Sequence, residues 1–444
     1  MTGNARTDTT ASGTVHHSSD FGWKPNQDVT EQFTRALTDG TLKAGDELFL
    51  DHSYRIDIMK EGCRRILPDN FTLSAARGAG FDVDGLTQEH DAPPPVLELG
   101  NRNTLRNLTI VCEGVPTKIF APKRHAKFFR AVAVSARGKD DILIENCRLS
   151  GLIRHNIKVA DCRRLNLIGC RIVGGYWSVY LVSVSDVTMR HSLFEKSTCD
   201  SIKTGSSPDG GICRNYVVEN CVFQDNGIGD GIDTTGGFND SVVRDCIFRR
   251  ILVSGMDIKS HYFPESGSLE GVEPQNNNIL IERCTFYDIP NAIILTTCSK
   301  PGVLTPENIE EYVVHDVDVN DCIVGYTKNS LMRAFEHYDG YGVTCHGRHY
   351  LSGEGEHMHA IYLKDAHSIR YRNLRLFGER TEEIMPAYVC SVVDSFPDDF
   401  TEEAAAVWKS FDHSITGNVI EEPAPPVEPG VTEVPFACGP QDMT

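Results

Sequence analysis

The sequence lacks the patterns that mark several large classes of protein. No apolar run approaches the ~20 residues that a membrane-spanning helix needs, so we expect no membrane span. The first residues, MTGNARTDTTASGTVHHSSD, contain no apolar core of the kind found in signal peptides. The chain in this form therefore carries no visible export signal, although a trimmed mature form of a secreted protein would look the same.

Positive charge is also scarce. The chain has 43 basic and 62 acidic residues and a formal net charge of −19 at pH 7. This excess repels phosphate groups, so we expect neither nucleic acid nor an anionic membrane as a partner. The 15 cysteines include no CxxC pair and are too sparse for a disulfide scaffold. Reduced, buried thiols and a cytoplasmic location are therefore favoured.

The sequence does contain a repeat that begins near residue 101. A phrase of the form apolar-polar-polar-Cys-x-apolar recurs, as in ILIENCRL, YVVENCVF and ILIERCTF. Its cysteines are Cys147, Cys170, Cys221, Cys246, Cys284 and Cys322, with Ser192 filling the gap after Cys170. Small side chains that stack on their own kind inside a coil explain this column without a metal or redox role.

A second phrase interleaves with the first and is centred on an aliphatic residue: Ile157, Leu181, Ile202, Ile232, Ile258 and Ile293. From each cysteine position to the next aliphatic position the chain takes 9 to 12 residues, whereas the return takes 11 to 29. Insertions therefore gather at one corner of the repeat. Short strands in a unit of about 22 residues predict an all-β fold, a parallel β-helix solenoid.

The two ends differ from the repeat. DVTEQFTRAL spaces Val29, Phe33 and Leu37 as one face of a helix, and the strand-like GDELFLDHSYRID follows, so this pair is expected to cap the solenoid. A second helix is predicted near residues 400–411. The predicted organisation is a disordered leader over 1–20, a β-helix domain over 21–385 (cap 21–100, regular coils 101–328, irregular coils and loops 329–385), and a C-terminal helix and Pro/Glu-rich tail over 386–444.

Charge concentrates in three phrases between Thr198 and His261: CDSIKT, GDGIDTT and GMDIKSH. Aligning their isoleucines places a charged residue after each one: Lys203, Asp233 and Lys259. Stacked in this register, the three phrases would form a ladder of charged side chains, whose carboxylates are Asp200, Asp230, Asp233 and Asp257. Carboxylates on strands ~4.8 Å apart repel one another, and a bound divalent cation relieves this repulsion. Because all the ligands would be oxygen atoms, Ca²⁺ is the favoured ion. The alternative is a solvated ladder in which Lys203 and Lys259 neutralise the aspartates.

These phrases resemble the pectate-lyase superfamily of right-handed parallel β-helices, and within it polysaccharide lyase family 9. The resemblance implies Ca²⁺-assisted β-elimination on an acidic, uronate-containing polysaccharide or oligosaccharide. It implies Asp200, Asp230 and Asp233 as calcium ligands and Lys259 as the base; Asp257 is a further candidate metal ligand. The chain departs from the family at Gly229, where the family has an aspartate, and Lys203, also a candidate catalytic residue, adds a positive charge nearby. His261, two residues beyond Lys259, is a candidate proton donor or substrate contact.

Other functions remain open at this stage. Paired aspartates on the same scaffold would suit a glycoside hydrolase, and a uronate epimerase differs from a lyase only in where the proton returns. A non-catalytic, tailspike-like rod that binds glycans is a further alternative. The oligomeric state is left open. The histidines between His337 and His359 permit either a metal site or substrate contacts; they are His337, His346, His349, His357 and His359.

Overall fold

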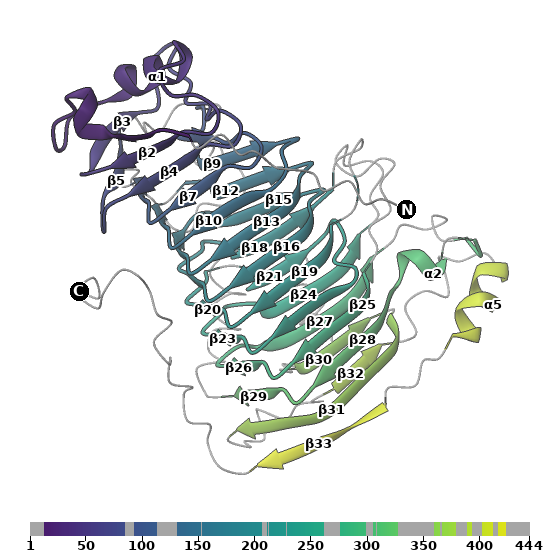
Figure 1. Cartoon of the computed structure of the whole chain (residues 1–444). Helices are drawn as coiled ribbons and strands as arrows, with labels where there is room; N and C mark the ends of the chain where they lie inside the picture. The colour runs from purple at the N-terminus through teal and green to yellow at the C-terminus, as the bar shows by residue number, and fades with distance from the viewer. Residues whose placement is uncertain are drawn as a thin grey trace, which may run out of the picture.

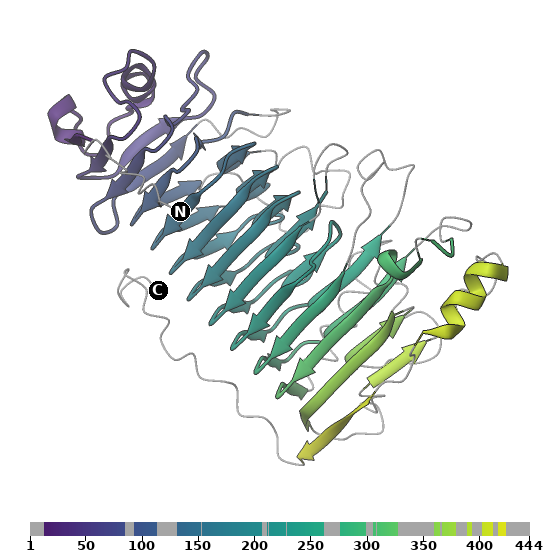
Figure 2. The ribbon, with the colours of Figure 1, turned by 45° about the vertical axis from the view of Figure 1, so that its right-hand side comes forward.

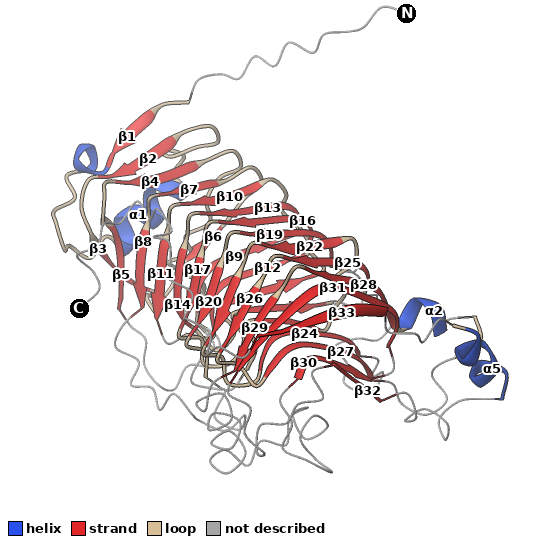
Figure 3. Cartoon of the chain, turned by 90° about the horizontal axis from the view of Figure 1, so that it is seen from below, coloured by secondary structure: helices blue, strands red, loops and turns tan. Residues whose placement is uncertain are grey.

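The computed structural model describes residues 13–84, 93–112, 131–151, 153–206, 211, 213–227, 229–261, 276–298, 305–307, 309–326, 359–364, 366–378, 389–392, 402–411 and 416–422. Over these residues the chain winds as a parallel β-helix, as the repeat predicts (Figure 1). Each regular coil contributes three short strands, and each strand pairs in parallel with its counterpart on the next coil. The strands thus form three rows along the rod, which can be followed by their labels in Figure 3.

One row is a separate ten-stranded sheet. We call it the site sheet because it carries the charged phrases. In spatial order its strands are β6 (Leu97–Glu98), β9 (Val132–Arg137), β12 (His155–Ala160), β15 (Val179–Val182), β18 (Ile202–Gly205), β21 (Ile232–Thr234), β24 (Ser254–His261), β27 (Asn291–Cys298), β30 (His359–Lys364) and β32 (Val389–Val392).

The other two rows form one 23-stranded sheet, joined where β31 pairs with both β28 and β29. The first row is β1 (Val15–His17), β2 (Glu47–Leu50), β4 (Thr72–Ala75), β7 (Thr104–Arg106), β10 (Ile142–Glu145), β13 (Arg163–Ile168), β16 (Ser185–Arg190), β19 (Arg214–Glu219), β22 (Ser241–Arg244), β25 (Asn277–Glu282), β28 (Val314–Asn320), β31 (Ala366–Gly378) and β33 (Thr416–Glu422). The second row is β3 (Tyr54–Asp57), β5 (Gly80–Asp84), β8 (Thr109–Cys112), β11 (Arg148–Gly151), β14 (Arg171–Gly174), β17 (Leu193–Glu195), β20 (Val222–Gln224), β23 (Ile247–Arg249), β26 (Thr285–Tyr287) and β29 (Ile323–Tyr326).

The cysteine column marks the turn between these two rows. Each cysteine, and Ser192 in the gap, is at most 2% exposed, which confirms an interior column. The preceding residue always has a positive φ, for example 52° at Asn146, 63° at Gly169 and 54° at Asp245. Glycine, asparagine and aspartate tolerate this left-handed conformation best. The repeated phrase therefore encodes a one-residue corner followed by a small interior side chain.

The last apolar position of the cysteine-containing phrase forms a second interior column. The rings of Phe194, Phe223, Phe248 and Phe286 stack face to face on successive coils, with centroids 4.9, 4.6 and 4.9 Å apart. All four side chains are fully buried. Because these four consecutive coils carry the same residue at the same place, the stack helps to fix how they align.

Helices lie at the two ends of the coil (Figures 1 and 2). Helix α1 (Thr30–Thr38) confirms the predicted N-terminal helix, and Phe33 stacks on Phe81 of β5 at a centroid distance of 5.6 Å. The short 3-10 helix η1 spans Ser18–Phe21. Helix α5 (Glu402–Ser410) confirms the predicted C-terminal helix, and its Trp408 packs with Ile309 of α2 (Ile309–Tyr312). None of the described helices has the length and apolar character that crossing a membrane requires.

The structure corrects the predicted boundaries at both ends. Strand β1 pairs with β2, although it lies within the predicted disordered leader, so at least residues 15–17 of that segment belong to the sheet. Strands β32 and β33 lie beyond residue 385, where only helix and tail were expected, and they extend both sheets. The remaining boundaries stay predictions.

The register of the site sheet corrects the alignment of the charged phrases. Ile202 pairs with Ile232 as expected, but Ile232 pairs with Met256 rather than Ile258. Likewise Ile202 pairs with Val179 rather than Leu181. One row of residues therefore crosses the sheet in the order Lys158, Tyr180, Lys203, Asp233 and Asp257. We call it the polar row; Lys259 lies outside it.

Candidate active site

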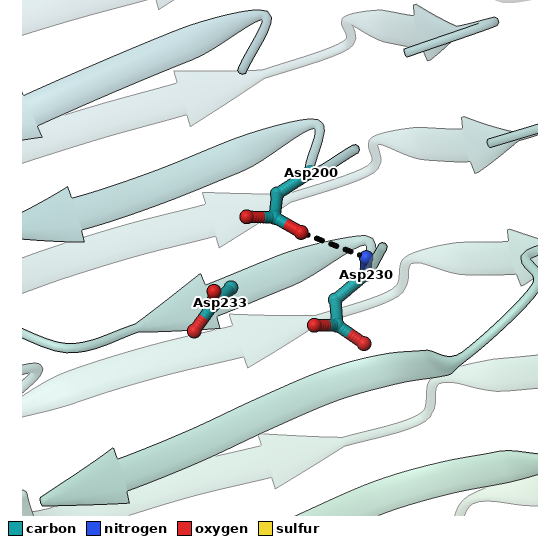
Figure 4. Close-up of side chains that lie close together, drawn as sticks. All are labelled: Asp200, Asp230 and Asp233. Atoms are coloured by element: carbon teal, nitrogen blue, oxygen red, sulfur yellow. Dashed lines mark hydrogen bonds between the residues drawn. The ribbon is translucent and has the colours of Figure 1, made fainter. Parts of the chain in front are cut away.

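The carboxylates of Asp200 and Asp230 are positioned by the backbone just before β18 and β21. The backbone N–H of Asp230 donates a hydrogen bond to Oδ1 of Asp200 at 3.0 Å (Figure 4). Oγ of Ser254 donates to Oδ1 of Asp230 at 2.6 Å. The carbonyl of Asp230 accepts from Asn226 of the same coil at 2.9 Å, and Nδ2 of Asn226 also donates to Oγ of Ser201 on the coil before it at 2.8 Å. Neighbouring coils therefore hold both carboxyl groups in place.

Asp233 lies in the strand itself and contacts two lysines. Lys203, its neighbour in the polar row, forms an ion pair with Oδ2 of Asp233. Nζ of Lys259 lies 2.9 Å from Oδ1 of Asp233 and 2.5 Å from Oδ2 of Asp257. Lys259 is 2% exposed and Asp233 4%. The arrangement is a buried network of charges in which Asp233 joins the two lysines.

Asp200, Asp230 and Asp233 converge on one point from two adjacent coils. One carboxylate oxygen from each lies within 4.8 Å of the others, and Figure 4 shows the three side chains side by side. All three are buried. Buried carboxyl groups this close repel one another when ionised, so protons or cations must offset part of their negative charge.

The pKa values of the three groups separate accordingly. Burial, followed by the charge of Asp233, raises the pKa of Asp200 to about 7. Burial and the charges of Asp257 and Asp200 raise the pKa of Asp230 well above its usual value. Burial also acts to raise the pKa of Asp233, but the two lysines outweigh it and hold that pKa below the usual range. At neutral pH Asp233 is ionised, while Asp200 and Asp230 retain a proton between them.

The backbone leaves no room for the aspartate that the resemblance expects at residue 229. A Cβ added to Gly229 would lie 2.2 Å from Oδ1 of Asp200 and 2.6 Å from the carbonyl carbon of Cys199. A side chain at this position would therefore displace Asp200. The glycine is required by the close approach of two coils, and a fourth carboxylate cannot be added there.

The predicted site residues thus divide into groups. Asp200, Asp230 and Asp233 come together, whereas Asp257 is paired with Lys259 and lies outside that trio in the described part of the chain. Lys203 and Lys259 both contact Asp233. His261 ends β24, and its side chain is outside the described residues.

Other predicted features lie outside the described residues. They are the side chains of the histidines from His337 to His359 and most of each insertion that follows β18, β24 and β27.

An aromatic group next to these charges was not predicted from the sequence. Tyr180 belongs to the polar row, two strands before Asp233, and Trp177 precedes β15. The signal was present in the sequence: aligning Val179 instead of Leu181 with Ile202 would have placed Tyr180 beside Lys203. Trp177 lies outside the strand and has no periodic pattern to reveal it.

Comparison with known proteins supports the fold and its handedness. Residues 124–262 match a family model described as "Right handed beta helix region". No curated protein sequence matches the chain. Among solved structures, the Streptococcus pneumoniae surface protein and adhesin PfbA has a TM-score of 0.58 at 12% identity, covering 92% of this chain and 96% of that one.

Two glycan-degrading enzymes have a similar fold. A polygalacturonase from Erwinia carotovora ssp. carotovora has a TM-score of 0.58 at 11% identity, covering 86% of this chain and 96% of that one. The catalytic domain of a GH87 alpha-1,3-glucanase, solved with tetrasaccharides, has a TM-score of 0.51 at 10% identity, covering 90% of this chain and 69% of that one. These likenesses establish a right-handed parallel β-helix, a fold that carbohydrate-active enzymes and adhesins share. None of the three is specific to polysaccharide lyase family 9.

Proposed function

We propose that this protein cleaves a glycan by hydrolysis at Asp200, Asp230 and Asp233. The observation that supports the proposal best is the separation of pKa values among these converging groups. The pKa is raised at Asp200 and Asp230 by burial, and it is lowered at Asp233 because two lysines outweigh burial. Glycoside hydrolysis requires such a set, with one carboxyl group protonated and another ionised.

Each group has a role that its surroundings suit. The Asp200–Asp230 pair holds a proton at neutral pH and is the proton source for the leaving sugar oxygen. Asp233 remains ionised and stabilises the positive charge that develops on the sugar ring as the bond breaks. Water then attacks the anomeric carbon, and its proton goes to the Asp200–Asp230 pair, which has given up its own. Ser254, through its hydrogen bond to Asp230, holds the pair in one orientation.

The surroundings of Lys259 do not suit a catalytic base. An amine must be neutral to accept a proton, but two carboxylates in contact favour its charged form. Lys259 contacts both Asp233 and Asp257 and is almost fully buried. Lys203 is no better placed, because the charge of Asp233 outweighs burial and raises its pKa. Elimination by a lysine base therefore receives less support than hydrolysis.

A calcium-assisted lyase is the second candidate, and the convergence of the carboxylates favours it. Oxygens of Asp200, Asp230 and Asp233 within 4.8 Å of one another could ligate a single Ca²⁺ ion. These three residues would hold the ion, which would stabilise negative charge developing at a substrate carboxylate. Against this candidate, both oxygens of Asp233 already contact lysines, and Gly229 excludes a further ligand.

A substrate screen with product analysis tests the proposal. The purified chain is incubated with neutral and uronate-containing oligosaccharides, with and without EDTA, and the products are separated by mass. Hydrolysis gives products heavier by one water, insensitive to EDTA. Unsaturated products that disappear with EDTA would instead support the lyase. Binding without cleavage of any glycan would favour a glycan-binding rod.

A further inference from the structure

An aromatic cluster adjoins the carboxylates on the preceding coils. The ring of Trp177 lies 5.0 Å from Tyr180 and 5.2 Å from Tyr176, measured between centroids. Behind them His155 is buried, stacks on both Trp177 and Tyr180, and contacts the carbonyl oxygen of Trp177 through Nδ1 at 3.0 Å. Burial lowers the pKa of His155 to about 3, so its ring supports the cluster in neutral form. Trp177, Tyr180 and Tyr176 themselves are only half-buried.

Positive charges surround this cluster although the protein is strongly acidic. The guanidinium carbon of Arg154 lies 5.8 Å from the centroid of the Trp177 ring, and Nζ of Lys203 lies 5.9 Å from it. Lys158 is the neighbour of Tyr180 in the polar row. Among the residues that the structure describes, no carboxylate pairs with Arg154 or Lys158. Burial and the nearby charges of Arg154 and Arg137 lower the pKa of Lys158, which is consistent with cations that lack a counter-charge.

Lys203 connects the cluster to the carboxylates. It lies between Tyr180 and Asp233 in the polar row, and it contacts Asp233 while facing the Trp177 ring. Its side chain is 13% exposed, more than those of Asp233 and Lys259. Two strand spacings, roughly 10 Å, therefore separate Tyr180 from Asp233. A chain of sugar rings lying along the site sheet would reach from one to the other.

We infer that Trp177, Tyr180, Arg154 and Lys158 form a binding site for an acidic sugar unit. An aromatic ring accepts the apolar face of a sugar ring, and cations at its rim that pair with no described carboxylate select a carboxylate or sulfate on that sugar. The inference rests on the proposed function for the identity of the ligand as a glycan. It adds that the substrate carries negative charge, and that the charged unit binds on the N-terminal side of the carboxylates.

Tryptophan fluorescence tests this site directly. The chain has three tryptophans, and Trp23 and Trp408 are both buried, so a ligand on this face should change the emission of Trp177. The full chain is titrated with tetrasaccharides of galacturonate, alginate and hyaluronan, their carboxyl-reduced forms, and a carrageenan tetrasaccharide that carries sulfate only. We expect saturable binding of at least one acidic form, weakened roughly tenfold or more by carboxyl reduction. Binding of carrageenan alone would assign the site to sulfate.

Single variants test the contribution of each residue, and conservative substitutions keep a loss of binding from being confused with unfolding. Arg154→Gln and Lys158→Gln should each weaken binding roughly tenfold, measured by calorimetry. Trp177→Phe keeps a ring and should abolish the fluorescence change while retaining weaker binding. Arg163→Gln removes an exposed charge on β13 and should change nothing. Equal binding of acidic and reduced tetrasaccharides, or no binding, would overturn the inference. Acidic-sugar binding without any cleavage would instead contradict only the proposed function.

Discussion

Lys259 and Asp233 lie on adjacent strands of the site sheet with Nζ and Oδ1 2.9 Å apart, and both side chains are almost fully buried. The same amine contacts Asp257. In the proposed reaction this contact is central, because it favours the ionised form of Asp233 while Asp200 and Asp230 have raised pKa values. We therefore propose that the lysine supports Asp233 and does not abstract a proton.

Removing one partner of this network should be far more costly than removing a matched pair. Lys259→Met leaves Asp233 and Asp257 buried with too little positive charge, so we expect a loss of about 3–5 kcal/mol in the free energy of unfolding. Lys259→Met with Asp257→Asn should recover part of that loss. Urea denaturation of the wild type, the single variant and the double variant measures the free energy of unfolding of each. Equal stability of wild type and Lys259→Met would show that the network is not buried as described.

A surface ion pair provides the control. Arg250 and Asp225 form a more exposed pair with Nε and Oδ1 2.6 Å apart. Asp225→Asn should change the free energy of unfolding by less than about 1 kcal/mol. A loss as large as that of Lys259→Met would mean that the effect reflects strand pairing and not buried charge.

Stability should fall as the pH rises towards 7. The pKa of Asp200 is about 7 in the folded chain, and its ordinary value is 3.8. The folded state therefore binds more protons than the unfolded state between these values, and a raised pKa stabilises the fold at low pH and loses that effect as pH increases. For one proton the slope is at most about 1.4 kcal/mol per pH unit. Asp200→Asn should flatten the dependence in urea denaturation between pH 5 and pH 8.

The same titration should appear in the pH profile of the reaction. Loss of the proton from the Asp200–Asp230 pair removes the general acid, so kcat/KM should fall as pH rises through about 7. An activity that rises through this range would indicate that a deprotonated group is needed instead, as a lyase base would be.

Gly229 should tolerate no side chain. A Cβ there would collide with Asp200, so Gly229→Ala should reduce activity and cost about 1–3 kcal/mol of stability. Gly211→Ala is the matched control, since a Cβ at Gly211 would have no neighbour within 4 Å among the described residues. Circular dichroism melts and initial rates compare the two. A fully active Gly229→Ala would show that the approach of the two coils is looser than described.

The repeat could be predicted from sequence because each coil uses the same residues for the same purpose. A left-handed corner, a small interior residue and a stacked phenylalanine recur in one phrase, as at Asn220, Cys221 and Phe223. Insertions do not obscure such a phrase, because they fall elsewhere in the coil. The fold was therefore accessible before any coordinates.

The register of the site sheet was harder to predict from the sequence, because side chains alternate between the two faces along a strand. Met256 and Ile258 both face the interior, so aligning either one with Ile232 keeps every side chain on its correct face. A shift of two residues cannot be recognised from hydrophobicity alone. The error placed Lys259 opposite Asp233 in the polar row, where Asp257 lies instead, and Lys259 reaches Asp233 from two residues further along its strand.

The central claim is tested most directly by measuring whether the oxygen of water enters the cleavage products. A glycan that the protein cleaves is incubated with the enzyme in water enriched in heavy oxygen, and the fragments are weighed by mass spectrometry. Hydrolysis by the aspartates predicts one heavy oxygen in each cleavage event, lost together with activity in Asp233→Asn. Fragments that contain no heavy oxygen and carry an unsaturated sugar would contradict the account.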